Sequence, residues 1–158
     1  MIAVIAVGRL KEAPYRAMAD EYLKRLSRFG RYEETEIPDL PEREGASPAE
    51  EDKIREREGE EILRRVKDGD WVVALTIPGK MTDSVTLAKK LAERKMRGTG
   101  RTVFVIGGSL GLGRNVISRA NEEMSMSPMT FPHQLARVML LEQLYRAEKI
   151  AAGERYHK

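Results

Sequence analysis

The chain has 158 residues with 41% hydrophobic content, which is enough for one compact domain with its own core. It has no cysteine, so disulfides, thiolate zinc sites, iron–sulfur clusters and cysteine nucleophiles are excluded, and with only two histidines we expect no metal site. The apolar N-terminal run stops at Gly8, too short for a membrane span, and it lacks the basic start of a signal peptide. We therefore expect a single domain over residues 1–158, cytoplasmic and without a membrane partner.

The net charge of +3 is divided unevenly along the chain. Residues 1–70 hold 14 Lys and Arg against 18 Asp and Glu, whereas residues 71–158 hold 14 against 7. One run of cations in the basic half could follow a nucleic-acid backbone, because each cation that neutralises a phosphate releases a counterion. The run comprises Lys89, Lys90, Arg94, Lys95, Arg97 and Arg101. A solvated helix face is an equally good interpretation of it.

The first half of the chain alternates strand and helix patterns. Residues 1–7 form a continuous apolar run, typical of a strand buried on both faces of a parallel sheet. A helix is predicted over 14–28, where a proline suits the first turn and apolar residues recur at helical spacing. A more polar strand is expected over 31–37, followed by a surface loop over 39–46. Residues 47–66 then predict a helix, because they begin with the capping sequence Ser-Pro-Ala-Glu.

The second half continues the alternation. Strands are predicted over 71–77, 102–106 and 124–127. Residues 78–80, Pro-Gly-Lys, are expected to end the first of these strands. Helices are predicted over 84–97, 116–120 and 134–151. The last helix is apolar around most of its circumference, so we expect burial on several sides and a homodimer interface. The whole pattern predicts an α/β fold with a parallel-type sheet and helices on both faces, which binds ligands beyond the carboxyl ends of its strands.

A glycine-rich turn follows the strand over 102–106. The sequence Gly107-Gly-Ser-Leu-Gly-Leu-Gly113 is not a P-loop, because Arg114 stands where that motif needs lysine. It is also an incomplete dinucleotide fingerprint, because Val116 replaces the third glycine. A glycine turn at a helix start lets a ligand approach the backbone closely and offers it free N–H groups. We favour a ligand site here over a simple tight turn.

Polar candidates lie near the end of the chain. His133 and Arg137 are four residues apart, on one face of the last helix at its start. A cation beside a histidine favours its neutral form, which can accept a proton, although an ion-paired arginine beside a structural histidine fits the same spacing. Tyr156 and His157 belong to a terminal Arg-Tyr-His-Lys sequence. Such a tail is either a frayed end or a group that stacks on a base and holds phosphate.

Several of these motifs agree in order and spacing with those of one known family. They are Val105-Ile-Gly-Gly-Ser-x-Gly-Leu112, Thr130-Phe-Pro-His-Gln134, Arg137-Val-x-Leu-x-Glu-Gln-x-Tyr-Arg146 and Tyr156-His-Lys158. The opening Ala-Val-Gly-Arg-Leu-Lys11 and the segment Leu75-x-Ile-x-Gly-Lys80 match too. Over nearly its whole length the chain resembles the RlmH family, the bacterial 23S ribosomal RNA pseudouridine N3-methyltransferases of the SPOUT superfamily.

The resemblance implies a specific enzyme. It would methylate N3 of a pseudouridine in 23S rRNA within the 70S ribosome, as a homodimer whose SPOUT-like fold carries a C-terminal trefoil knot that binds S-adenosylmethionine. By position, the cofactor residues would be Leu75, Gly107, Met126, Ser127, Pro128, Met129, Thr130 and Phe131. Catalysis would fall to His133, Arg137, Tyr156 and His157: Arg137 would stabilise the anionic imide and a histidine would orient it or take the proton. The partner subunit would supply the Tyr156 tail. The resemblance implies no metal, because the cofactor's methyl group is already activated.

Two other classes compete with this interpretation. A non-catalytic ribosome- or RNA-binding module would use the same basic half and bind RNA without S-adenosylmethionine, and its glycine turn would serve packing alone. A nucleotide-binding oxidoreductase is disfavoured by the missing third glycine and by the lack of a clear acidic residue about 20 positions beyond the turn.

Overall fold

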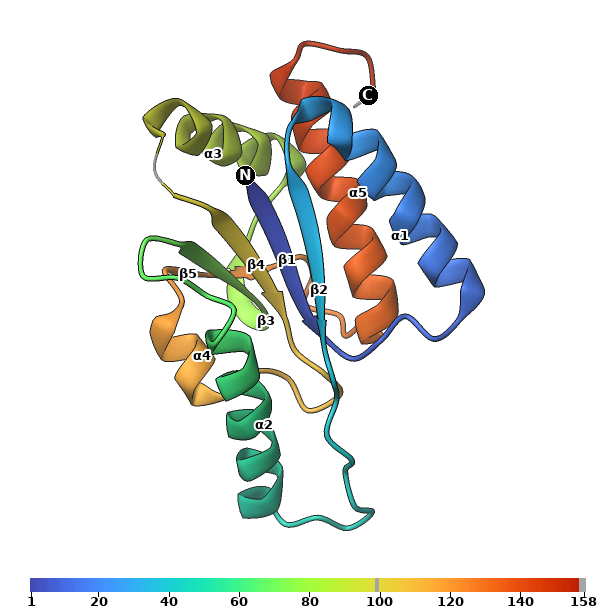
Figure 1. The fold of residues 1–158 in the computed structure, drawn as a ribbon, viewed down its shortest axis with the longest axis vertical. Coiled ribbons are helices and arrows are strands. Elements are labelled where there is room, and N and C mark those ends of the chain that lie inside the picture. The colour runs from blue at the N-terminus through green and yellow to red at the C-terminus, as the bar shows by residue number, and fades with distance from the viewer. Residues whose placement is uncertain (99, 157–158) are drawn as a thin grey trace.

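The computed structural model of the chain describes residues 1–98 and 100–156. Within them lies one parallel five-stranded sheet with strand order β2-β1-β4-β3-β5 (Figure 1). The strands are β1 (Ile2–Val7), β2 (Tyr32–Ile37), β3 (Trp71–Met81), β4 (Thr102–Ile106) and β5 (Glu122–Ser125). The helices are α1 (Ala13–Leu26), followed by the 3-10 turn η1 (Ser27–Phe29), α2 (Pro48–Leu63), α3 (Ser84–Arg97), α4 (Arg114–Arg119) and α5 (His133–Ala151).

Helices cover both faces of the sheet, as the sequence predicts. Helices α1, α3 and α5 lie on one face, and α2 and α4 lie on the other (Figure 1). Alternate residues of β1 enter the two cores: Ile2, Val4 and Ala6 pack towards α1 and α5, whereas Ala3, Ile5 and Val7 pack towards α2 and α4. Because both faces are buried, β1 is a continuous apolar run.

The predicted start of α2 is confirmed atom by atom. Ser47 Oγ accepts a hydrogen bond from Glu50 N, and Glu50 Oε2 accepts one from Ser47 N at 2.8 Å. This capping box satisfies two backbone donors that the first helical turn leaves free.

The end of β3 differs from the prediction. Residues 78–80 do not end the strand: β3 continues to Met81 after a register shift, so that Met124 pairs first with Leu75 and then with Lys80. The residues between Leu75 and Lys80 form a bend beside β5. A Cβ at Gly79 would lie 2.8 Å from the Met124 carbonyl carbon. Glycine at this position lets the two backbones touch.

The last strand is also placed differently. Strand β5 spans Glu122–Ser125 and not 124–127. It is an edge strand, so Glu122 can pair with Lys90 at 2.9 Å and Glu123 can turn towards solvent. Charged residues are common on such edges.

The apolar circumference of α5 has an explanation within the chain. The helix lies between α1 and α3 and packs on the sheet, and Leu140, Leu141 and Leu144 are fully buried. Its apolarity therefore does not require a second copy of the chain. The homodimer and the trefoil knot stay predictions, and none of the described helices is long and apolar enough to cross a membrane.

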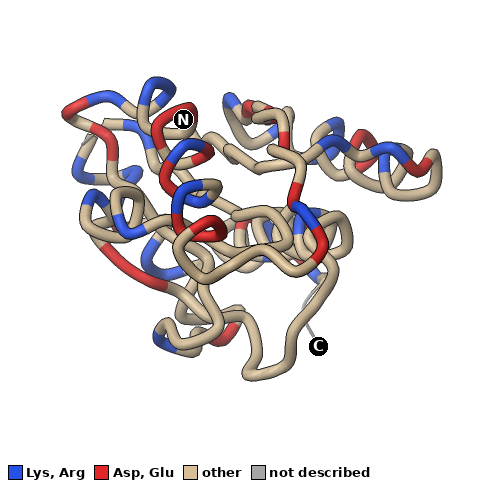
Figure 2. Tube along the Cα trace, turned by 90° about the horizontal axis from the view of Figure 1, so that it is seen from below, with Lys and Arg blue, Asp and Glu red and all other residues tan. Residues whose placement is uncertain are grey.

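The basic run over residues 89–101, most of which lies on α3, is largely engaged in contacts within the chain. Arg94 stacks 3.5 Å from the Trp71 ring centroid, Lys95 pairs with Glu148, and Arg101 binds Asp70 with Nη2 at 2.6 Å. Figure 2 shows basic and acidic segments interleaved over the molecule. These contacts favour a structural role for the run over contact with a nucleic-acid backbone.

Candidate active site at the carboxyl ends of β3 and β4

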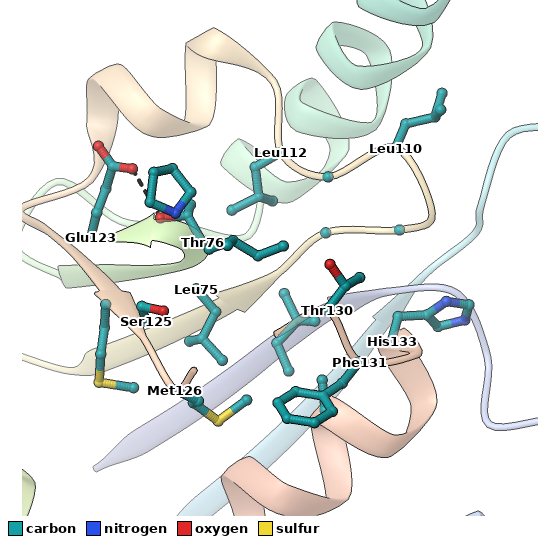
Figure 3. Close-up of a pocket in the computed structure, with 18 of the residues that line it drawn as sticks. Leu75, Thr76, Leu110, Leu112, Glu123, Ser125, Met126, Thr130, Phe131 and His133 are labelled. Carbon is teal, nitrogen blue, oxygen red and sulfur yellow. Dashed lines mark hydrogen bonds between the residues drawn. The ribbon is translucent and has the colours of Figure 1, made fainter. Parts of the chain in front are cut away.

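A cavity of about 930 Å³ opens beyond the carboxyl ends of β3 and β4 (Figure 3). Three segments line it: the last residues of β3 before the bend, the glycine turn after β4, and the segment from β5 to the start of α5. The rule for parallel sheets picked out these turns from sequence. All the predicted cofactor residues except Pro128 line the cavity.

The glycine turn closes tightly on itself. Gly111 N donates to Gly108 O at 3.1 Å, and Gly111 has φ +83. A Cβ at Gly107 would lie 2.6 Å from the carbonyl carbon of Gly111. Only glycine fits at position 107 without opening the turn, so the cavity wall here is bare backbone.

The helix start after the turn does not offer free donors. Glu56 Oε1 accepts from Arg114 N at 2.8 Å and from Asn115 N at 3.4 Å. The sequence prediction that a ligand would use these N–H groups is therefore wrong, because a carboxylate from α2 already caps them.

The segment after β5 is shaped by serine hydrogen bonds. Ser125 Oγ donates to Ser127 O at 3.0 Å, and Met129 N donates to Ser127 Oγ at the same distance. These bonds turn the chain back towards α5. Met126 and Phe131 thereby join Leu75 in the lining of the cavity, much of which is apolar (Figure 3).

Two charged residues of the lining were missed from sequence. Arg55 of α2 donates to Leu110 O at 3.3 Å and pairs with Asp52 at 2.5 Å. Glu123 accepts from Thr76 Oγ1 at 3.0 Å, across the gap between β5 and β3 (Figure 3). The predicted strand over 124–127 leaves Glu123 outside it, so the sequence does not indicate that Glu123 lies at the cavity. No local signal in α2 marks Arg55 as a cavity residue.

His133, the first residue of α5, lies at the edge of the cavity. Its imidazole rests against Gly8 at the end of β1, where a Cβ would lie 3.0 Å from Nε2. Gly8 has φ +89, which favours glycine on its own. The residue that follows β1 thus supports the imidazole ring of His133.

Arg137 does not reach the cavity. It is 0% exposed; its Nη1 donates to Glu34 at 3.1 Å and to Glu36 at 2.7 Å, and its Nη2 donates to Gly8 O at 2.6 Å. Burial alone would raise the pKa of Glu36, but hydrogen bonds from Leu10 N and Arg137 outweigh it and lower the pKa. The prediction that Arg137 touches the substrate is corrected: it ties α5 to β1 and β2.

Tyr156 packs against α5, and it is outside the lining of the cavity. Tyr156 Oη donates to Glu142 at 3.2 Å, and its ring meets that of Tyr145 edge-on with centroids 5.0 Å apart. Burial and a hydrogen bond with Tyr22 raise the pKa of Tyr156 to about 12. His157, the other predicted tail residue, lies outside the described residues.

A family described as predicted SPOUT methyltransferase matches residues 1–157. Proteins named ribosomal RNA large subunit methyltransferase H are similar over 157 residues and 99% of both chains, with 48% identity in Alkaliphilus oremlandii and 50% in Bifidobacterium animalis subsp. lactis.

A crystal structure of a methylase family protein from Neisseria gonorrhoeae has the same fold. Its TM-score is 0.55 with 14% identity, over 91% of this chain and 81% of that one. The family predicted from the motifs is confirmed. The chain belongs to the SPOUT methyltransferases and, within them, to the family of ribosomal RNA large subunit methyltransferase H.

Proposed function

We propose that this chain methylates N3 of a pseudouridine in the 23S rRNA of the assembled ribosome, with S-adenosylmethionine as the methyl donor. The observation that carries the proposal is the cavity: segments far apart in sequence, each predicted to hold the cofactor, line one space at the carboxyl ends of β3 and β4. The names of the full-length relatives support ribosomal RNA of the large subunit as the substrate class.

The lining suits S-adenosylmethionine. Apolar side chains at Leu75, Leu112 and Phe131 can pack against an adenine ring. The bare backbone at Gly107 lets the polar edge of the ring approach the main chain closely. When bound, the cofactor supplies a methyl group already activated on a sulfonium.

The protein must then position the imide nitrogen of the base and remove its proton. His133 is a side chain at the edge of the cavity that can orient the base or accept that proton, and it stands in the predicted catalytic set, unlike Glu123 of the same lining. Arg137 acts through the backbone, because its hydrogen bond to Gly8 O holds the surface on which the imidazole rests. We therefore assign His133 as the catalytic candidate and Arg137 as a positioning residue.

A homodimer is part of the proposal, on grounds other than those the sequence suggested. Two apolar side chains that line the cavity are exposed, Ile77 by 49% and Met129 by 69%, and so are Met81 by 65% at the end of β3 and Val85 by 53% at the start of α3. Exposed apolar groups of this size are common at interfaces. Such a dimer could bring the partner's tail to the cavity, which the Tyr156 of the same chain does not line. Val85→Glu should yield monomers in sedimentation analysis; a dimer that persists at wild-type affinity would remove Val85 from the interface.

The test is transfer of labelled methyl from S-adenosylmethionine to three acceptors: whole ribosomes that lack the modification, isolated large subunits and naked rRNA. We expect label in large-subunit RNA of whole ribosomes, and loss of about 100-fold or more in kcat for His133→Ala with unchanged cofactor affinity. Lys24→Gln, on the exposed end of α1, is the control. A folded chain that binds ribosomes but labels no acceptor would refute the enzyme and favour the RNA-binding module.

A further inference from the structure

The loop that joins β1 to α1 is held at two points. Gly8 N donates to Ile37 O at 2.8 Å, while Gly8 O accepts from Arg137. Two residues on, Leu10 N donates to Glu36 Oε1 at 3.0 Å, and the Leu10 side chain is 7% exposed in the core. The backbone of this loop is therefore fixed before any ligand arrives.

Two cations flank the buried leucine. Arg9 and Lys11 are both exposed, and Lys11 N donates to Arg9 O at 3.0 Å, which closes a three-residue turn between them. Within residues 1–98 and 100–156, neither side chain makes an ion pair, a hydrogen bond or a ring contact, and the neighbouring Glu12 is exposed and pairs with neither. This contrasts with Lys90, which is bound to a carboxylate.

The loop lies beside the catalytic candidate. Gly8, which touches the imidazole of His133, is the residue directly before Arg9. Since consecutive Cα atoms are about 3.8 Å apart, Arg9 and Lys11 follow within roughly three residue lengths of that contact. Figure 3 shows His133 at the margin of the cavity, where α5 begins.

We propose that Arg9 and Lys11 bind backbone phosphates of the RNA next to the nucleotide that enters the cavity. The inference rests on the proposed function and names part of its substrate contact. Unpaired cations on a fixed loop lose little conformational freedom on binding, so they suit contacts that set the register of an RNA without reading its sequence. The turn carries two positive charges within three residues, which suits contacts with neighbouring phosphates.

The test compares the double variant Arg9→Gln/Lys11→Gln with wild type and with Lys24→Gln. Lys24 is an exposed lysine near the other end of α1, about 16 Å along the helix. Three quantities are measured: kcat and KM for ribosomal acceptor, the dissociation constant of S-adenosylmethionine, and the dependence of RNA binding on salt. We expect the double variant to raise KM about tenfold at low salt and to reduce the log–log salt slope by about 1.4 to 1.8. Values of kcat, cofactor affinity and thermal midpoint should stay at wild type, as should all readings of Lys24→Gln.

Each other outcome overturns the inference in a recognisable way. An unchanged KM and salt slope would show that the RNA does not contact these cations. A fall in kcat at constant KM would assign the loop to support of His133, and weaker cofactor binding would assign it to the carboxylate of S-adenosylmethionine. If the wild-type chain transfers no methyl group, the proposed function is refuted. The salt dependence of RNA binding, compared between wild type and the double variant, would still test the role of Arg9 and Lys11.

Discussion

Replacement of Arg137 by methionine should destabilise the chain strongly, whereas removal of a second arginine from the same glutamates should not. Arg137 is fully buried and donates to Glu34, Glu36 and Gly8 O. Methionine has a similar reach but no donor, so Arg137→Met removes the hydrogen bonds that Arg137 gives to Gly8 O and to two partly buried carboxylates. Arg16 binds Glu34 at 2.7 Å and lies 3.6 Å from Glu36, but its side chain is 33% exposed.

The magnitude follows from burial. Loss of one partner of a buried ion pair costs about 3–5 kcal/mol. Arg16 stays close to both carboxylates and compensates part of the lost charge, so we expect the lower end, about 3 kcal/mol for Arg137→Met. In a chain of this size that corresponds to a fall of roughly 6–12 °C in Tm. Arg16→Gln breaks a partly exposed pair and should cost about 1 kcal/mol, less than Arg137→Met.

Thermal and urea unfolding, followed by circular dichroism at pH 7, measure both variants against wild type. Arg137→Met combined with Glu34→Gln and Glu36→Gln should recover part of the loss, because the uncompensated charges are then gone. If Arg137→Met and Arg16→Gln lose the same stability, burial does not decide the strength of this network, and the assignment of Arg137 as a tie between α5 and the sheet is wrong.

Three further outcomes are expected. Gly107→Ala should weaken S-adenosylmethionine binding at least about tenfold in calorimetry, since its Cβ would meet backbone at 2.6 Å, while Gly69→Ala, with nothing within 4 Å, should not. Asp70→Asn should cost more stability at pH 7 than at pH 3: burial alone would raise the pKa of Asp70, yet hydrogen bonds from Arg101 hold it below its ordinary value. The stabilisation is therefore complete above about pH 4 and declines as the pH falls through the lowered pKa of the folded chain. Urea midpoints at the two pH values decide this, and an equal loss at both would contradict it. Ser47→Ala should lower the free energy of unfolding by about 1 kcal/mol through loss of the cap, and no shift in the urea midpoint would show the cap to be dispensable.

The parts of the fold that were predictable from sequence have local causes. The apolar runs over 1–7 and 102–106 are strands because helices bury both of their faces, and the Ser47 capping box marks a helix start within four residues. Strand β5 was misplaced because it is an edge strand, where Glu122 and Glu123 can face away from the core. The continuation of β3 was missed because Pro78-Gly79 ordinarily ends a strand, and only contact with β5 restores the pairing.

The candidate site shows the same division. The strand-end rule located the cavity, and motif positions identified its lining. The spacing of His133 and Arg137 correctly put both residues on α5, but spacing along one helix does not show which element covers each side chain. Arg137 is covered by Glu34 and Glu36, about a hundred residues earlier in the chain, and no local pattern links them.

The bend of β3 across β5 constrains the order in which the chain can fold. Met124 pairs with Leu75 before the bend and with Lys80 after it. Because both pairs use Met124, we expect the bend in β3 to form only when β5 is in place. These pairs are separated by more than forty residues in sequence, and such distant parallel pairings form slowly because a long loop must close first. The segment 126–131, which forms the far wall of the cavity, follows β5 directly. We therefore expect the chain to collapse and gain its helices before it can bind a ligand in the cavity, which makes ligand binding a late step on its folding pathway.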